Sequence, residues 1–119
     1  MLETIATLES EQYGEERTHE LLHQHPDLVG FFMGGSGIEG VLQALRSRRS
    51  NTRLIGVGTE LTAITRSGLL GGQFHSVLSH PLALLCPELV AHMAEALANP
   101  APGLRQVLVP LEIWTRENV

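Results

Sequence analysis

The chain of 119 residues has no lysine, one cysteine, few aromatic residues and no long apolar run. All eight basic residues are arginines, against 13 acidic residues, and the net charge of -5 argues against a chain that grips nucleic-acid phosphates by itself. Aromatic residues make up 4% of the chain, which disfavours a base-stacking surface. No apolar stretch reaches the roughly 18 to 20 residues that a membrane span needs, so we expect no membrane partner.

The single cysteine leaves the redox context open, and the N-terminus bears on the expected location. The single Cys86 cannot form an internal disulfide, and the simplest interpretation is a free thiol in a cytoplasmic protein. The first four residues, MLET, show neither the basic region nor the apolar region of a secretory signal peptide. We therefore expect a cytoplasmic location.

Apolar residues make up 43% of the chain, enough for one packed domain. Helix-like and strand-like runs alternate, which predicts an α/β fold: a three-layer, mainly parallel sheet of about four to five strands with right-handed crossovers and helices on both faces. Strands are predicted at residues 4–8, 28–33, 53–57, 74–78 and 107–114. Helices are predicted at 11–25, 36–48, 61–70, and from Pro81 or Pro87 to about residue 98.

The sequence also predicts two helix N-caps and one buried helix face. Ser10 is the predicted N-cap of the first helix, and Ser36 forms a predicted capping box with Glu39 at the second. The spacing of apolar residues in the last helix predicts a buried stripe. The stripe consists of Leu89, Val90, Met93, Ala94 and Leu97.

In parallel sheets, ligands bind just beyond the carboxyl ends of the strands. That rule selects three loops in this chain, at residues 34–37, 58–60 and 79–81. We expect a functional site at these loop tips, side by side along one rim of the sheet.

The first loop contains Gly35, Gly37 and Gly40 in the spacing GxGxxG, and Glu60 lies twenty positions after the last of them. This pattern is typical of a dinucleotide site, in which the helix N-terminus faces the pyrophosphate and the carboxylate binds the ribose hydroxyls. No set of catalytic partners follows, and the more common explanation is a tight strand-to-helix turn. The exposed amides and the Ser36 hydroxyl would suit a neutral, oxygen-rich ligand equally well.

The segment from His19 through Glu20 to His23 fits HExxH, the helical zinc-protease pattern. Pro26 ends the predicted helix soon after the second histidine, and no third ligand is obvious. A solvated helix face is the more common explanation of such a pattern.

Two polar residues at the other loop tips have two interpretations each. Glu60 is either a carboxylate favoured by the dipole of the following helix or an acceptor for ligand hydroxyls. His80, directly before Pro81, is either an ordinary loop histidine or a ligand contact at a hinge. Cys86 is more typical of a packing residue than of a nucleophile, because no histidine and acid are arranged around it.

The order of segments resembles a known family. The segments FFMGG, GVLQAL, LIGV, ELT and GQFHSVLSH follow one another, and the chain closes on VPLEIWTRENV. This order resembles the C-terminal part of the LacI family of transcriptional regulators and the related periplasmic sugar-binding proteins. The likeness spans essentially the whole chain, although Gly35 and Ile38 stand where many relatives have polar residues.

The resemblance implies a regulator that closes on a small effector, often a sugar, and is not a catalyst. By position, it assigns ligand binding to Gly35, Ser36, Gly37, Glu60 and His80, with no metal and no cofactor. It also implies that residues 1–80 are part of the C-terminal effector-binding lobe, and that residues 81–119 form a helix and strand that cross to the other lobe. Operator DNA would be bound only through a helix-turn-helix that this chain lacks.

The other lobe is also lacking, so the apolar stripe of the last helix needs a different cover. We therefore expect a homodimer, with exchanged C-terminal elements as one arrangement. The alternative functions are the sugar-binding component of a periplasmic transporter, an NAD-dependent enzyme using Gly35, Gly37, Gly40 and Glu60, and a zinc hydrolase.

Overall fold

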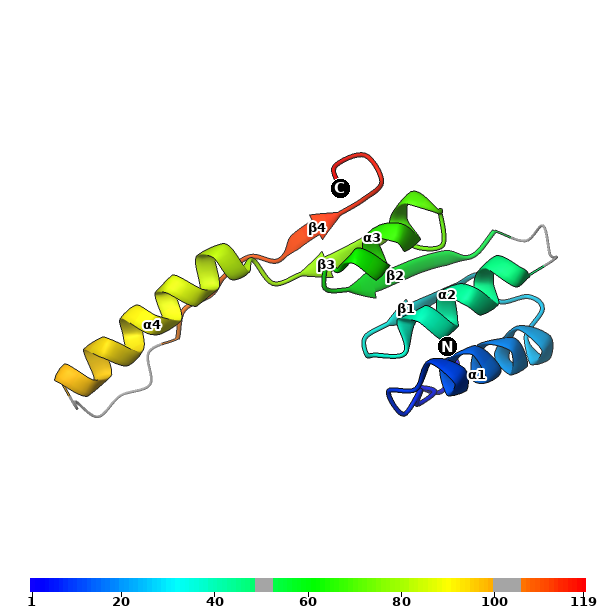
Figure 1. Ribbon diagram of the computed structural model, residues 1–119, viewed down its shortest axis with the longest axis horizontal. Helices are drawn as coiled ribbons and strands as arrows, with labels where there is room; N and C mark the ends of the chain where they lie inside the picture. Colours follow the sequence, from blue (N-terminus) through cyan, green and yellow to red (C-terminus); the bar gives the residue numbers. More distant parts are fainter. Residues whose placement is uncertain (49–52, 100–105) are drawn as a thin grey trace.

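The computed structural model describes residues 1–48, 53–99 and 106–119. Four strands form one sheet in the order β1-β2-β3-β4; the first three are parallel and β4 runs antiparallel to β3 (Figure 1). The predicted α/β class with a mainly parallel sheet is therefore confirmed. In chain order, the elements are α1 (Glu11–Gln24), β1 (Gly30–Met33), α2 (Ile38–Ser47), β2 (Ile55–Thr59), α3 (Ala63–Leu70), β3 (Ser76–Ser79), α4 (Leu82–Ala98) and β4 (Glu112–Trp114).

The core lies between the sheet and the two helices that connect its parallel strands, α2 and α3. Phe74 is its largest buried side chain, and its ring centroid lies 5.8 Å from that of Phe31 on β1. Gly56 and Gly58 on β2 leave room for these two rings, because a Cβ atom at either position would press against one of them. The other buried apolar residues of this core are Met33, Val41, Leu42, Leu69 and Val77.

Helix α1 packs against α2 through two glycines. A Cβ atom at Gly40 of α2 would lie 1.8 Å from the Glu11 carbonyl oxygen, and one at Gly14 of α1 would lie 2.8 Å from the Gly37 carbonyl oxygen. Two helices approach this closely only where a side chain is absent from the contact. The two glycines therefore set the position of α1 beside the first crossover helix.

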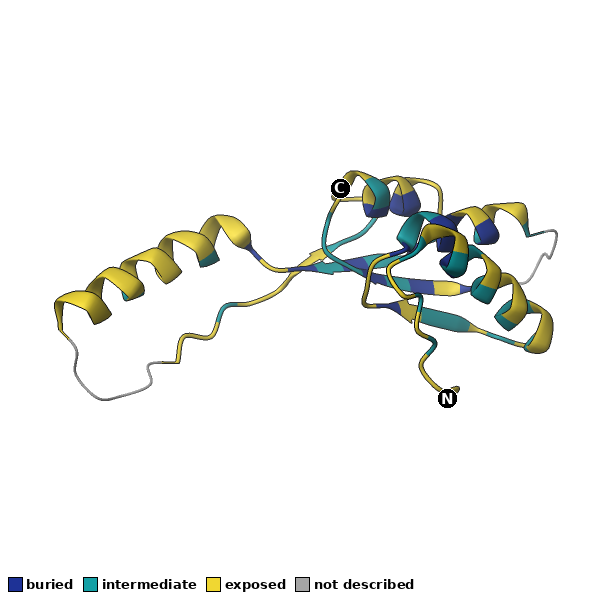
Figure 2. Ribbon diagram, turned by 60° about the horizontal axis from the view of Figure 1, so that its bottom comes forward, coloured by how far each residue is buried: buried dark blue, intermediate teal, exposed yellow. Residues whose placement is uncertain are grey.

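The face of the sheet opposite the core is open within the described residues (Figure 2). Phe32 and Ile113 on this face are 64% and 60% exposed, and Ile55 is 48% exposed. Helix α4 projects away from the body, which gives the chain an elongated shape of 59 × 30 × 24 Å (Figure 1). The described residues thus form two layers and a helical arm; they do not supply the third predicted layer.

Several local predictions are confirmed. Ser10 caps α1 by accepting a hydrogen bond from the Tyr13 amide, and α1 ends at Gln24, just before Pro26. Of the two prolines proposed to open the last helix, Pro81 is its N-cap, whereas Pro87 lies inside it. None of the helices that the structure describes combines the length and the apolar character needed to cross a membrane.

Residues 4–8 do not form the predicted strand. Leu8 and Glu9 have positive φ angles of 51° and 58°, and the Ser10 amide donates to the Thr7 carbonyl at 3.1 Å. The chain therefore turns sharply here to bring Ser10 into its capping position, and an extended strand cannot continue through that turn.

The predicted capping box of Ser36 and Glu39 is also wrong. Gly37 is the N-cap of α2, with φ of 80° and no side-chain capping bond. A capping box does form at α3, where Thr62 and Thr65 satisfy each other's backbone amides. The left-handed conformation of Gly37 lets the chain leave β1 and enter α2 without a side-chain cap.

At the C-terminus, two predictions need correction. The last strand covers only Glu112–Trp114 of the predicted 107–114, because residues 107–111 lie beyond the end of β3, its pairing partner. The predicted buried stripe of α4 is exposed instead: the exposed fractions of Leu89, Val90, Met93 and Leu97 lie between 57% and 85%. Within the described parts of the chain nothing covers the stripe, because α4 extends away from the sheet and core.

Candidate ligand-binding rim

The three predicted loops lie at the same edge of the sheet. Met33 at the end of β1 is in register with Gly58 of β2, and Thr59 is in register with Leu78 of β3. Because the three strands are parallel neighbours, the loops that follow them lie in order along one edge. We call this edge, made of residues 34–37, 58–60 and 79–81, the rim.

Glu60 and His80 meet at the rim. One Glu60 carboxylate oxygen, Oε1, is hydrogen-bonded to the ring Nδ1 of His80, and the other, Oε2, accepts from the His80 backbone amide at 3.4 Å. Both side chains are substantially exposed, at 45% and 60%. The structure thus brings together two of the predicted site residues, on loops that follow different strands.

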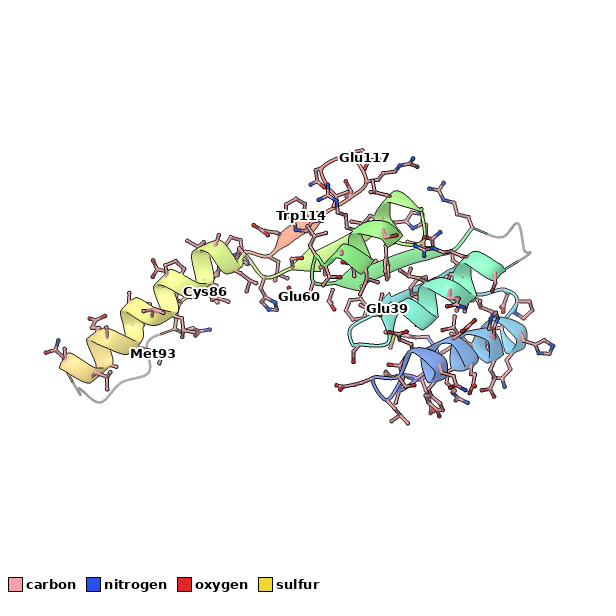
Figure 3. All side chains as sticks on the ribbon, viewed as in Figure 1. Glu39, Glu60, Cys86, Met93, Trp114 and Glu117 are labelled. Carbon is pink, nitrogen blue, oxygen red and sulfur yellow. The ribbon has the colours of Figure 1, made fainter. Side chains whose placement is uncertain are left out.

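Glu60 has an unusual backbone. Its φ angle is 58°, in the left-handed region that non-glycine residues rarely adopt, and its amide donates to the Leu78 carbonyl at 2.8 Å. In Figure 3 its side chain lies at the end of the sheet from which α4 leaves. Strained backbone of this kind is concentrated at functional sites, where the surrounding structure holds it in place.

The first loop supplies backbone groups and one hydroxyl. Gly35 and Ser36 are exposed, and a Cβ atom at Gly35 would meet nothing within 4 Å. The Thr7 hydroxyl donates to the Ser36 carbonyl at 2.9 Å, which ties this loop to the N-terminal segment. Gly37 is the buried turn into α2. Gly35 and Ser36 are thus accessible at the rim, whereas Gly37 mainly shapes the turn.

Glu39 is an acidic residue beside the rim that sequence reasoning missed. It lies in the first turn of α2, next to the first loop, and in Figure 3 it lies at the same end of the sheet as Glu60. The sequence pattern assigned it to the capping box, which does not form. Its place one turn after a rim loop was the signal that could have identified it.

Packing accounts for much of the GxGxxG pattern. Gly40 is required by the close approach of α1, and Gly37 by its positive φ angle. Two of the three glycines therefore have reasons within the fold that do not involve a nucleotide. Glu60, the acidic residue of the pattern, is bonded to His80.

The HExxH segment lies on α1, where its glutamate, Glu20, interacts with neighbouring side chains. Glu20 forms an ion pair with Arg17 and accepts a hydrogen bond from Gln24 at 3.1 Å. His19 lies 3.8 Å from Glu15 and 3.5 Å from the Ser47 hydroxyl. Among the residues that the structure describes, no three metal-binding side chains are grouped.

A small cavity of about 190 Å³ lies away from the rim, at the amino-terminal ends of the strands. None of the predicted site residues lines it. Its walls are formed by Phe31, Leu45, Arg48, Arg53, Leu54, Gly72 and Gln73.

No protein-family model matches the chain, and no curated protein matches it. Solved structures do match. The glucose-galactose binding protein GanP from Geobacillus stearothermophilus superposes with a TM-score of 0.79 at 15% identity, over 95% of this chain and 40% of that protein. A solute-binding protein of an ABC transporter from Agrobacterium vitis, with bound D-fucose, superposes with a TM-score of 0.77 at 13% identity, over 98% and 40%.

A protein described as a putative regulator also superposes on the chain. A putative LacI transcriptional regulator from Bacteroides fragilis superposes with a TM-score of 0.71 at 16% identity, over 87% of this chain and 36% of that protein. The chain spans 36% to 40% of the length of these three solved structures. The chain therefore forms part of a periplasmic-binding-protein type I-like α/β fold.

Proposed function

We propose that the rim is half of a sugar-binding cleft and that Glu60 is its principal acceptor for ligand hydroxyls. The observation that carries this proposal is the Glu60 carboxylate itself, held in a left-handed turn at the carboxyl end of β2 and accessible to solvent. A carboxylate only accepts hydrogen bonds when ionised, and it suits the hydroxyl donors of a sugar. The match to proteins described as binding glucose, galactose and D-fucose supports the same ligand class.

For the biological context, we propose the effector-binding portion of a LacI-type transcriptional regulator, in the cytoplasm and without catalytic activity. The order of sequence segments and the closing residues 115–119 favour this context, and a putative LacI regulator is among the matching structures. DNA binding would belong to a helix-turn-helix outside these residues. The second candidate is the sugar-binding component of a transporter, which the match to the Agrobacterium vitis protein favours.

Sugar binding to the chain is testable directly. Because half a cleft encloses only part of a ligand, we expect dissociation constants on the order of millimolar for D-galactose, D-glucose or D-fucose. Glu60→Gln keeps the size of the side chain and removes its charge, so it should weaken binding about tenfold or more. Saturation-transfer NMR measures the dissociation constants of the unmodified chain and of the Glu60→Gln variant.

The matched control is Glu117→Gln, which removes one carboxylate from the segment that follows β4. Because β4 runs antiparallel to β3, this segment lies at the end of the sheet opposite the rim. This variant should bind sugars as the unmodified chain does. Equal weakening in both variants would indicate a general charge effect, and undiminished binding by Glu60→Gln would remove Glu60 from the site.

We also propose that the exposed apolar stripe of α4 is covered in a homodimer. The helix is 17 residues long, and none of its residues is buried. An exposed apolar surface of this kind marks an association site. A twofold arrangement would let each copy cover the stripe of the other.

Met93→Glu tests this arrangement. It places a charge in the middle of the stripe, between Leu89 and Leu97, and should convert the dimer to a monomer in analytical ultracentrifugation. Ala91→Glu adds the same charge about 200° around the helix and should leave the dimer intact. An unmodified chain that remains monomeric at about 100 µM would contradict the dimer.

A further inference from the structure

Two buried hydroxyl groups converge on the turn that carries Glu60. Among the described residues, only two polar side chains belong to buried residues, Thr65 with 0% exposure and Ser79 with 4%. Thr65 lies on α3 and Ser79 ends β3, so the two come from different elements. Both hydroxyls bond to the backbone of the Glu60–Leu61 turn.

Three hydrogen bonds of normal length hold the turn. The Thr65 hydroxyl donates to the Glu60 carbonyl at 2.7 Å. The Ser79 hydroxyl accepts from the Leu61 amide at 2.7 Å. The Glu60 amide donates to the Leu78 carbonyl at 2.8 Å. The amide and carbonyl of Glu60 and the amide that follows it are therefore all bonded, which leaves the side chain as the outward-facing part of the turn.

Two features of this turn are each unfavourable for the free energy of folding unless other contacts offset them. A hydroxyl buried without a partner destabilises a protein, and a left-handed backbone is unfavourable for glutamate. Both buried hydroxyls have partners here: Ser79 bonds to the Leu61 amide, and Thr65 bonds to the Glu60 carbonyl as well as to Thr62. The same bonds hold the left-handed backbone of Glu60 in place. A glycine at position 60 would adopt the same φ angle without strain. The fold instead holds a carboxylate there.

We propose that Thr65 and Ser79 are positioning residues that hold the Glu60 carboxylate at the rim in the orientation that accepts ligand hydroxyls. This inference rests on the proposed function, because it takes Glu60 as the ligand acceptor. Neither hydroxyl contacts the ligand. Thr65 fixes the turn relative to α3 and Ser79 fixes it relative to β3, so the direction of the carboxylate is set by two elements of the fold.

Thr65 also takes part in the capping box with Thr62, so its removal affects stability as well as the turn. The test therefore needs a readout that a merely structural role would not move. Two such readouts are sugar affinity, measured with D-galactose and D-fucose, and the backbone NMR shifts and couplings of Glu60, which report its φ angle.

The experiment compares Thr65→Val, Ser79→Ala and Thr65→Ser with the control Thr18→Val. Thr18 donates to the Gly14 carbonyl at 2.6 Å within α1, so the control removes a comparable bond away from the rim. Thr65→Val and Ser79→Ala should each weaken sugar binding about tenfold and move the Glu60 resonances away from left-handed values. Thr65→Ser, which keeps the hydroxyl, should restore both, and the control should change neither.

The Ser79→Ala variant keeps the inference testable if Thr65→Val does not fold. Folded variants that retain the affinity and the left-handed resonances of Glu60 would overturn the positioning role. If the unmodified chain binds neither sugar, the proposed function fails, and the Glu60 resonances alone then decide whether the hydroxyls hold the turn.

Discussion

Replacing Gly40 by alanine should destabilise the chain by about 1 to 3 kcal/mol. The new Cβ atom would lie 1.8 Å from the Glu11 carbonyl oxygen and 2.8 Å from the Glu15 amide nitrogen. These are backbone atoms, which cannot rotate away as a flexible side chain could, so α1 would have to move off α2. Alanine has the higher helix propensity by about 1 kcal/mol, so without this contact the substitution would stabilise the helix.

Urea denaturation followed by far-ultraviolet circular dichroism measures the effect, with the fluorescence of Trp114, the one tryptophan, as a second probe of the core. Gly35→Ala is the matched control, because a Cβ atom there meets nothing within 4 Å. It should change the free energy of unfolding by less than about 0.5 kcal/mol. A stabilised Gly40→Ala variant would show that α1 does not pack against α2 as described.

Replacing Glu60 by glycine should stabilise the fold while abolishing sugar binding. Glycine adopts a φ angle of 58° without steric cost, whereas an L-residue in this region loses about 1 to 2 kcal/mol. The bond to His80 is lost as well, but exposed pairs of this kind contribute only about 0 to 1 kcal/mol. Sugar affinity and urea midpoint should therefore change in opposite directions.

Glu60→Ala separates the two effects. It removes the same carboxylate but keeps the left-handed strain, so it should lose sugar binding without gaining stability. We expect the glycine variant to be more stable than the alanine variant by about 1 kcal/mol. Equal stability of the two variants would mean that the backbone at residue 60 is not held in the left-handed region in solution.

The rim can be predicted from the sequence because it follows from the periodic spacing of apolar residues. Alternating strand and helix patterns imply parallel strands, and parallel strands bring their carboxyl ends to one edge. The placement of the three loops along one edge follows from this rule. The pairing of Glu60 with His80 does not, because it depends on the backbone conformation at residue 60, which side-chain patterns do not encode.

Other features could not be predicted because they depend on contacts between distant segments. Gly40 fits a nucleotide-binding pattern in the sequence, but the structure gives it a packing role against α1. The α4 stripe has the spacing of a buried helix, and whether it is buried depends on a partner surface that the pattern does not identify. Glu39 was assigned to a capping box that Gly37 makes unnecessary.

The most direct test of a sugar-binding rim is a chemical-shift map of the 15N-labelled chain titrated with D-galactose and D-fucose. The largest shifts should fall on the amides of residues 34–37, 60 and 80, and they should saturate together. Shifts concentrated at the opposite edge instead, around Arg53 and Gln73, would contradict the assignment of the ligand site to the carboxyl ends of the strands.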